Sequence, residues 1–297
     1  MSEQGQTTDA NAVREAVAAS YGKRISRPRG SGCCASSGSC SPIAETIGYG
    51  KEDVGGLPAG ADVPTFGCGN PLAFSKVAGG DTVVDLGSGA GFDLLIAAGK
   101  VGTSGRVIGF DMTDEMIEKA RANVAAAGHT NVEVRKGLIE DLPIESGTVD
   151  WVISNCVINL SPEKDRVFAE IARVLKPGGR MLVSDIVVED LPQWVRESMV
   201  AVAACVGGAI GEGQYIQGLR DAGLVDVEVR ARHVYSAEEI LPLLESVDPA
   251  WAEEIQEAVA GSGCCGEVSC CDGSAVAELA GKGASIQVFA RKPVTAV

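Results

Sequence analysis

One stretch near residue 90 constrains the fold of this chain more than any other. Residues 82–98 read TVVDLGSGAGFDLLIAA: a β-branched run ends at Asp85, three glycines follow at alternate positions, and an apolar, helix-forming run comes next. Glycine lets the backbone approach a ligand closely, and free N–H groups at the start of the helix face that ligand. A carboxylate inside the turn favours a ligand with a cationic head and hydroxyls. The glycines are Gly87, Gly89 and Gly91.

A β-α alternation continues from this turn and predicts a doubly wound parallel sheet. The expected strands are 106–111, 131–136, 149–155 and 180–185, and the expected helices between them are 113–127 and 161–175. Four strands are followed by polar side chains, and ligands of open α/β sheets bind at that rim. These side chains are Asp85, Asp111, Glu140 and Asn155. We expect Asp111 to accept the hydroxyls of a ribose, and the segment of Leu138, Ile139 and Glu140 to bracket a planar base.

The two ends of the chain depart from this alternation. A helix is expected over 11–21, followed by a Gly/Ser/Pro-rich arm over 24–64. Helices over 191–204 and 215–222 precede two alternating strands, 225–234 and 284–291. The pattern predicts an N-terminal helix and cysteine-bearing arm (1–65), a ligand-binding core (66–188) and a C-terminal region (189–297) that adds the last two strands.

Charge and hydropathy exclude several classes of partner. The 297 residues carry a net charge of −15, which argues against a nucleic-acid partner. No apolar run reaches the length of a membrane span, and the N-terminus lacks the pattern of a signal peptide. We therefore expect a cytoplasmic protein without a membrane partner. The sequence does not encode the oligomeric state, and a monomer is our expectation.

Ten cysteines are unusual for such a protein. In a reducing compartment they do not indicate a static disulfide framework, and they favour a soft metal or metalloid, or redox chemistry. Taken singly, each internal cysteine would be read as a packed thiol. They fall into an N-terminal set (Cys33, Cys34 and Cys40), three separate residues (Cys68, Cys156 and Cys205) and a C-terminal set (Cys264, Cys265, Cys270 and Cys271).

The Gly-rich turn, the acid after the second strand, LIEDLP, and SNCVINL followed by RVLKPGG and VSD together resemble the class I S-adenosylmethionine methyltransferases. Another doubly wound nucleotide-binding fold is the alternative. The resemblance implies an α/β fold with a seven-stranded Rossmann-like sheet and S-adenosylmethionine as cofactor. It assigns cofactor binding to Asp85, Gly87, Gly89, Gly91, Asp111, Met112, Leu138, Ile139, Glu140 and Asn155.

The contexts of three cysteines narrow the resemblance. FGCGNPLAF, SNCVINLSPEKD and ACVGGAI together resemble the arsenite methyltransferases. By that match Cys156 and Cys205 hold arsenic, and Cys68 is the third thiol and redox partner. Cys33 or Cys34 is the resolving thiol, and the doublet leaves both open.

The chemistry of arsenic agrees with this assignment. Trivalent arsenic is thiophilic, and three thiolates leave its lone pair free to attack the methyl carbon of a sulfonium. Methyl transfer oxidises arsenic formally, and a thiol pair returns the electrons by forming a disulfide that thioredoxin or glutathione reduces. We expect arsenite or its glutathione conjugate as substrate, and a disulfide of Cys33 or Cys34 with Cys68 in each turnover.

The C-terminal CC-x4-CC has three interpretations. Its spacing does not match a zinc knuckle. It resembles the vicinal pairs near the C-terminus of many arsenite methyltransferases, which implies accessory arsenic capture by Cys264, Cys265, Cys270 and Cys271. A loop without a defined role is the third.

Two other functions stay open at this point. A quinone-type C- or O-methyltransferase would share the core without needing the thiols, so its activity would survive Cys156→Ser. A non-catalytic arsenite-binding protein would hold arsenite without turnover, although retention of both Asp85 and Asp111 argues against it.

Overall fold

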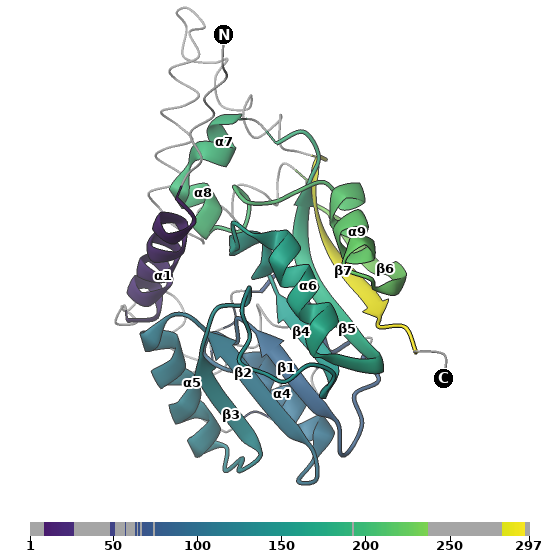
Figure 1. The fold of residues 1–297 in the computed structure, drawn as a ribbon. Coiled ribbons are helices and arrows are strands. Elements are labelled where there is room, and N and C mark those ends of the chain that lie inside the picture. The colour runs from purple at the N-terminus through teal and green to yellow at the C-terminus, as the bar shows by residue number, and fades with distance from the viewer. Residues whose placement is uncertain are drawn as a thin grey trace, which may run out of the picture.

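The computed structural model describes residues 9–26, 48–50, 57, 63, 65, 67–73, 75–191, 193–236 and 281–294 (Figure 1). The arm cysteines and the C-terminal cysteine pairs lie outside these residues. No helix within the described ranges is long and apolar enough to cross a membrane.

A seven-stranded sheet in the order β3-β2-β1-β4-β5-β7-β6 confirms the predicted fold class. The first five strands run parallel, and β7 lies antiparallel between β5 and β6. The strand order reverses between β1 and β4, which is where ligands of doubly wound sheets bind. The strands are β1 (Thr82–Leu86), β2 (Arg106–Asp111), β3 (Val132–Lys136), β4 (Val149–Asn155), β5 (Leu175–Val188), β6 (Val225–Val234) and β7 (Gly283–Arg291).

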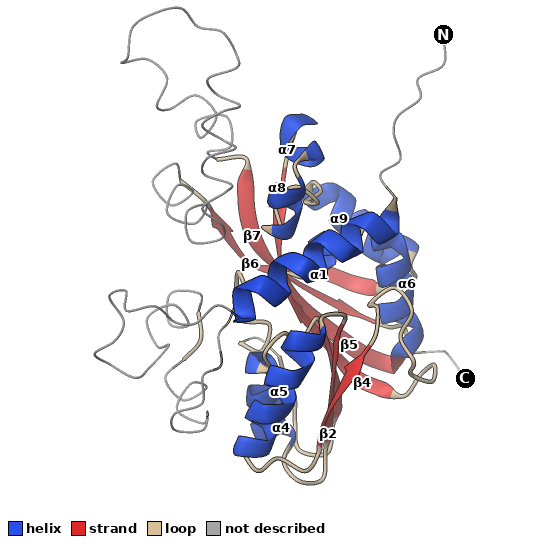
Figure 2. Ribbon diagram, turned by 90° about the vertical axis from the view of Figure 1, so that its left-hand side faces the viewer, coloured by secondary structure: helices blue, strands red, loops and turns tan. Residues whose placement is uncertain are grey.

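Helices cover both faces of the sheet because the central strands are apolar on both sides. On one face α4 (Phe92–Val101) and α5 (Asp114–Ala126) pack on β1, β2 and β3. On the other, α6 (Lys164–Val174) and α9 (Glu212–Asp221) pack on β5 and β6. The long helix α1 (Ala10–Ser26) passes the carboxyl ends of the strands and contacts both α5 and α8 (Met199–Ala203), as Figure 2 shows.

Two expected elements differ in extent from the structure. The fifth strand is longer than 180–185, because Leu175 already pairs with Val149 and Val188 still pairs with Gly283. The helix expected over 191–204 is two short helices, α7 (Gln193–Glu197) and α8. The Ser198 hydroxyl accepts a hydrogen bond from the Ala201 N–H at 3.1 Å and so begins a new helix.

Candidate functional site

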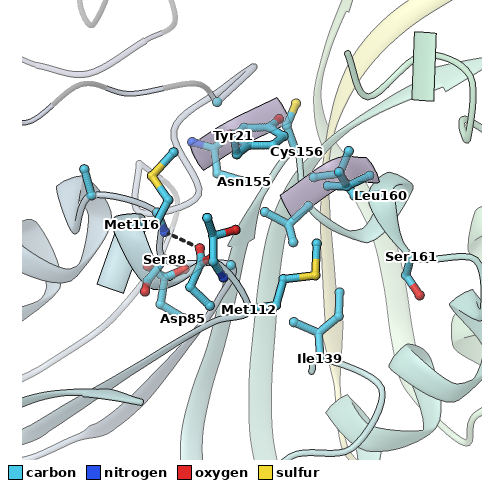
Figure 3. A pocket seen from close by; sticks show the side chains of 18 of the residues that line it. Tyr21, Asp85, Ser88, Met112, Met116, Ile139, Asn155, Cys156, Leu160 and Ser161 are labelled. Atoms are coloured by element: carbon cyan, nitrogen blue, oxygen red, sulfur yellow. Dashed lines mark hydrogen bonds between the residues drawn. The ribbon is translucent and has the colours of Figure 1, made fainter. Parts of the chain in front are cut away.

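A cavity opens at the carboxyl ends of β1, β2 and β4, beneath α1 (Figure 3). The predicted cofactor residues that line it are Asp85, Gly87, Gly89, Asp111, Met112, Leu138, Ile139, Glu140 and Asn155. The polar side chains expected after neighbouring strands therefore do lie at one cavity, while their roles stay predictions. Cys156 lines the same cavity.

Asp85 lies buried at the floor of the cavity, where its Oδ2 atom has no hydrogen-bond partner among the described residues. Burial raises the pKa of this carboxyl well above its usual value, and the nearby Asp93 and Asp111 raise it further. A cation bound beside Asp85 would offset the cost of burying its charge. The cavity floor therefore fits a ligand with a positively charged head.

Asp111 holds the glycine-rich turn in place. Its Oδ2 accepts a hydrogen bond from the Gly89 N–H at 2.9 Å, and its Oδ1 accepts one from the Thr113 N–H at 2.8 Å. Burial raises the pKa of this carboxyl, and the backbone N–H donors oppose the rise. Each oxygen keeps acceptor capacity, so the carboxylate can still receive hydroxyls of a ligand.

Gly87 and Gly91 of the turn make different close contacts. Gly87 has φ +69°, and a Cβ there would lie 2.4 Å from Val157 Cγ1, so the turn fits tightly against the segment after β4. Gly91, at φ +92°, does not line the cavity. A Cβ on it would lie 3.5 Å from Ala120 Cα, so it lets α4 approach α5.

Residues of α1 complete the cavity, and no local sequence pattern predicts this role for them. Arg14 donates to the buried Glu140 carboxylate, with Nη2 3.0 Å from Oε1, and also pairs with Glu163. The Ser161 hydroxyl donates to the same Glu140 oxygen at 2.7 Å. Tyr21 lines the cavity further along the helix. Such contacts join residues far apart in the chain, so local patterns do not reveal them.

The three internal cysteines gather beside this cavity. Cys68 and Cys156 form a disulfide, with their Cα atoms 5.9 Å apart. The buried Cys205 thiol donates to the Cys156 carbonyl oxygen at 2.8 Å, and the Tyr21 hydroxyl lies 3.6 Å from its sulfur. In the structure Cys156 is thus the partner of Cys68, whereas the sequence predicted Cys33 or Cys34, which lie outside the described residues.

The backbone at two of these cysteines is strained. Cys156 has φ +58° and Cys205 has φ +64°, a left-handed conformation that costs a non-glycine residue about 1–2 kcal/mol. Residues in this conformation concentrate at functional sites, where the surrounding structure holds them. Both positions therefore agree with a shared role.

The surroundings of Cys205 favour the protonated form of its thiol. Burial raises the pKa of its thiol to about 12, and the charge of Asp185 contributes to the rise. Asp185 is itself fully buried inside β5, and burial raises its pKa to about 7. The sequence identified Asp185 only as a strand end, although an acid after an apolar strand was the available signal.

The part of the chain that the structure describes contains no cluster of three or more His, Cys, Asp or Glu side chains arranged to hold a metal ion. A role for Cys264, Cys265, Cys270 and Cys271 stays a prediction, because these residues fall outside the described ranges.

Comparisons with known proteins agree on one family. A family model described as a methyltransferase domain matches residues 78–242. An arsenite methyltransferase of Halobacterium salinarum is 48% identical over 67% of this chain and 50% of its own length. One of Aquipseudomonas alcaligenes is 40% identical over 54% of this chain and 48% of its own. The chain thus spans about half the length of these curated relatives.

A solved structure extends the likeness to three dimensions. It is the crystal structure of an arsenic(III) S-adenosylmethionine methyltransferase from Chlamydomonas reinhardtii, with 32% sequence identity and a TM-score of 0.57. The similarity covers 78% of this chain and 71% of that one.

Proposed function

Because the chain belongs to the arsenite methyltransferase family of S-adenosylmethionine-dependent methyltransferases, we propose that it methylates trivalent arsenic held by Cys68, Cys156 and Cys205. The observation that carries the proposal is the meeting of these three cysteines beside the cavity that Asp85 and Asp111 line. Detoxification of arsenic is the biological role that such an activity would serve.

The cavity residues fit S-adenosylmethionine. The unpartnered Asp85 oxygen would take the cationic head, and Asp111 would accept the ribose hydroxyls. The segment of Leu138, Ile139 and Glu140 would bracket the base. When bound, S-adenosylmethionine supplies a methyl group on a sulfonium, which the arsenic lone pair takes without a general base. The chain's contribution is to hold the reactants together and exclude water.

The thiols take up arsenic by ligand exchange. Each thiol replaces one hydroxyl of arsenite, and its proton leaves with that hydroxyl as water, so three thiols give three Cys–As bonds and three waters. The Cys68–Cys156 disulfide must first accept two electrons from a thiol reductant. We infer that thioredoxin or glutathione supplies them.

The thiol cycle closes the electron balance. Methylation raises the formal oxidation state of arsenic by two, and two cysteine thiolates return two electrons when they join as a disulfide. The proposed cycle uses Cys68 together with Cys156, Cys33 or Cys34. The substrate is arsenite or its glutathione conjugate, and the protein acts in the cytoplasm as a monomer without nucleic acid or membrane.

Separation of arsenic species by chromatography tests the function. Wild type and Cys40→Ser, a cysteine without an assigned role, are incubated with arsenite, S-adenosylmethionine, glutathione and a thioredoxin system beside Cys156→Ser and Cys205→Ser. We expect methylated arsenic from the first two proteins and none from the others. A wild type that binds S-adenosylmethionine but makes no methylated arsenic would contradict the proposal. Tight arsenite binding would then point to sequestration, and its absence to a small-molecule methyltransferase.

A further inference from the structure

The segment SNCVINL carries an asparagine on each side of Cys156, and each one bonds to the backbone of a different distant cysteine. The Asn155 Oδ1 atom accepts hydrogen bonds from the Cys68 N–H at 3.0 Å and the Gly69 N–H at 3.3 Å. Its Nδ2 donates to the Gly69 carbonyl at 2.7 Å. The Asn155 amide thus acts as both hydrogen-bond acceptor and donor to the backbone of the Cys68 loop.

The rest of the Asn155 side chain is also committed to the protein. Its Nδ2 donates to the Tyr49 hydroxyl at 2.9 Å and lies 3.3 Å from Asp93 Oδ2. The Tyr49 hydroxyl in turn donates to Asp93 Oδ1 at 2.7 Å. An amide has two N–H donors and two acceptor lone pairs, and these contacts occupy all four. Asn155 faces the cavity (Figure 3), yet its polar atoms are used by the loop.

Glycine lets the Cys68 loop lie directly against this amide. A Cβ at Gly67 would lie 2.2 Å from Asn155 Cγ, and one at Gly69 would lie 2.8 Å from Ser184 Oγ. Both distances are shorter than side chains tolerate. The glycines on either side of Cys68 are therefore explained by contact with Asn155 and the end of β5.

Asn159 does the same for Cys205. Its Nδ2 donates to the Cys205 carbonyl at 3.2 Å and to the Ile186 carbonyl at 2.6 Å, so it ties the turn of Cys205 to the end of β5. A Cβ at Gly208 would lie 2.1 Å from the Asn159 carbonyl oxygen. The backbone after Cys205 therefore closes onto the same residue.

We propose that Asn155 and Asn159 are positioning residues that bring the Cys68 and Cys205 thiols to Cys156. Asn155 holds Cys68, and Asn159 holds Cys205. The left-handed backbone at Cys156 is held on both sides, because its N–H donates to the Ser184 carbonyl at 2.8 Å and its carbonyl accepts from the Cys205 thiol at 2.8 Å. A role for Asn155 and Asn159 in arsenic binding rests on the proposed function, whereas their role in positioning the thiols does not.

Two thiol measurements on full-length Asn155→Ala and Asn159→Ala test the proposal. The first is the glutathione ratio at which the disulfide is half reduced, followed by mass spectrometry of peptides 52–76 and 137–164. Each of these carries one cysteine, Cys68 or Cys156. The second is the alkylation rate of Cys205.

The two variants should give opposite patterns. Asn155→Ala should make the disulfide easier to reduce, so the ratio of reduced to oxidised glutathione at half reduction should fall about tenfold. The alkylation rate of Cys205 should stay within about twofold of wild type. Asn159→Ala should speed Cys205 alkylation by about tenfold and leave the half-reduction ratio within about twofold. If both variants shift both readouts alike, general loosening explains them and the proposal is wrong. Asn159→Ser replaces Asn159→Ala if the latter does not fold.

A third measurement separates this role from cofactor binding. Asn155→Ala should keep its S-adenosylmethionine Kd within about threefold, since the amide is saturated by the protein. Loss of cofactor binding with an unchanged half-reduction ratio would return Asn155 to the cofactor site and overturn the proposal. None of these readouts uses arsenic, so a failure of arsenite methylation would leave them interpretable.

Discussion

The raised pKa of Cys205 predicts that its thiol is alkylated very slowly. With a pKa of about 12 in place of the ordinary 9.0, the thiolate fraction at pH 8 falls about a thousandfold. Because the thiolate is the nucleophile, we expect iodoacetamide to alkylate Cys205 at least about a thousandfold more slowly in the folded protein than in urea. The rate should rise about tenfold per pH unit from pH 7 to 10.

Mass spectrometry measures this rate without interference. Cys205 is the single cysteine of the tryptic peptide 197–220, and in the disulfide form Cys68 and Cys156 do not react. Asp185→Asn serves as the matched variant, since loss of its charge lowers the Cys205 pKa and should speed alkylation above pH 7. A rate that levels off near pH 9, or no response to Asp185→Asn, would refute the reasoning.

Three further predictions concern stability and are measured by urea unfolding. Burial raises the folded pKa of Asp185 to about 7, so the stabilising contribution of this carboxyl is complete below its unfolded pKa near 4 and is lost as the pH rises through 7. At pH 8 the Asp185→Asn variant should therefore be more stable than wild type, by at most about 4 kcal/mol. At pH 4 it should have no such advantage. Gly89→Ala should cost about 1–2 kcal/mol for its positive φ, and Gly87→Ala about 1–3 kcal/mol more for its clash with Val157; equal losses would contradict the packing. Arg14→Leu should cost about 1–3 kcal/mol by leaving a buried carboxylate without its cation, and an unchanged midpoint would show that this pair is dispensable.

The sequence predicted the sheet well because local patterns determine it. Apolar, β-branched runs ending in polar residues located β1, β2 and β4, and the strand-end rule then placed Asp85, Asp111 and Asn155 at one cavity. The alternation over 225–234 predicted β6 with its observed bounds. These features depend on neighbours in the chain, so sequence periodicity contains them.

The thiol pairing and the cover of the cavity depend on distant contacts. Arg14 and Glu140 lie 126 residues apart, and nothing local to either indicates that they meet. The pairing of Cys68 with Cys156 depends on a loop held by Asn155, whose strand-end position alone indicated a cofactor ligand. Sequence reasoning singled out Glu140, Cys68 and Cys156 but could not assign the residues that they contact.

The helix α1 sets a fixed length between the two halves of the site. Arg14 bonds to Glu140 at the cavity, and Tyr21, seven positions later, lies against the sulfur of Cys205. Two turns of helix span about 10 Å and cannot stretch. A single residue inserted between them would rotate Tyr21 by about 100° and carry its ring away from Cys205 while Arg14 kept its place. The number of residues in this interval, more than their identity, therefore determines whether the cavity and the thiol stay in register.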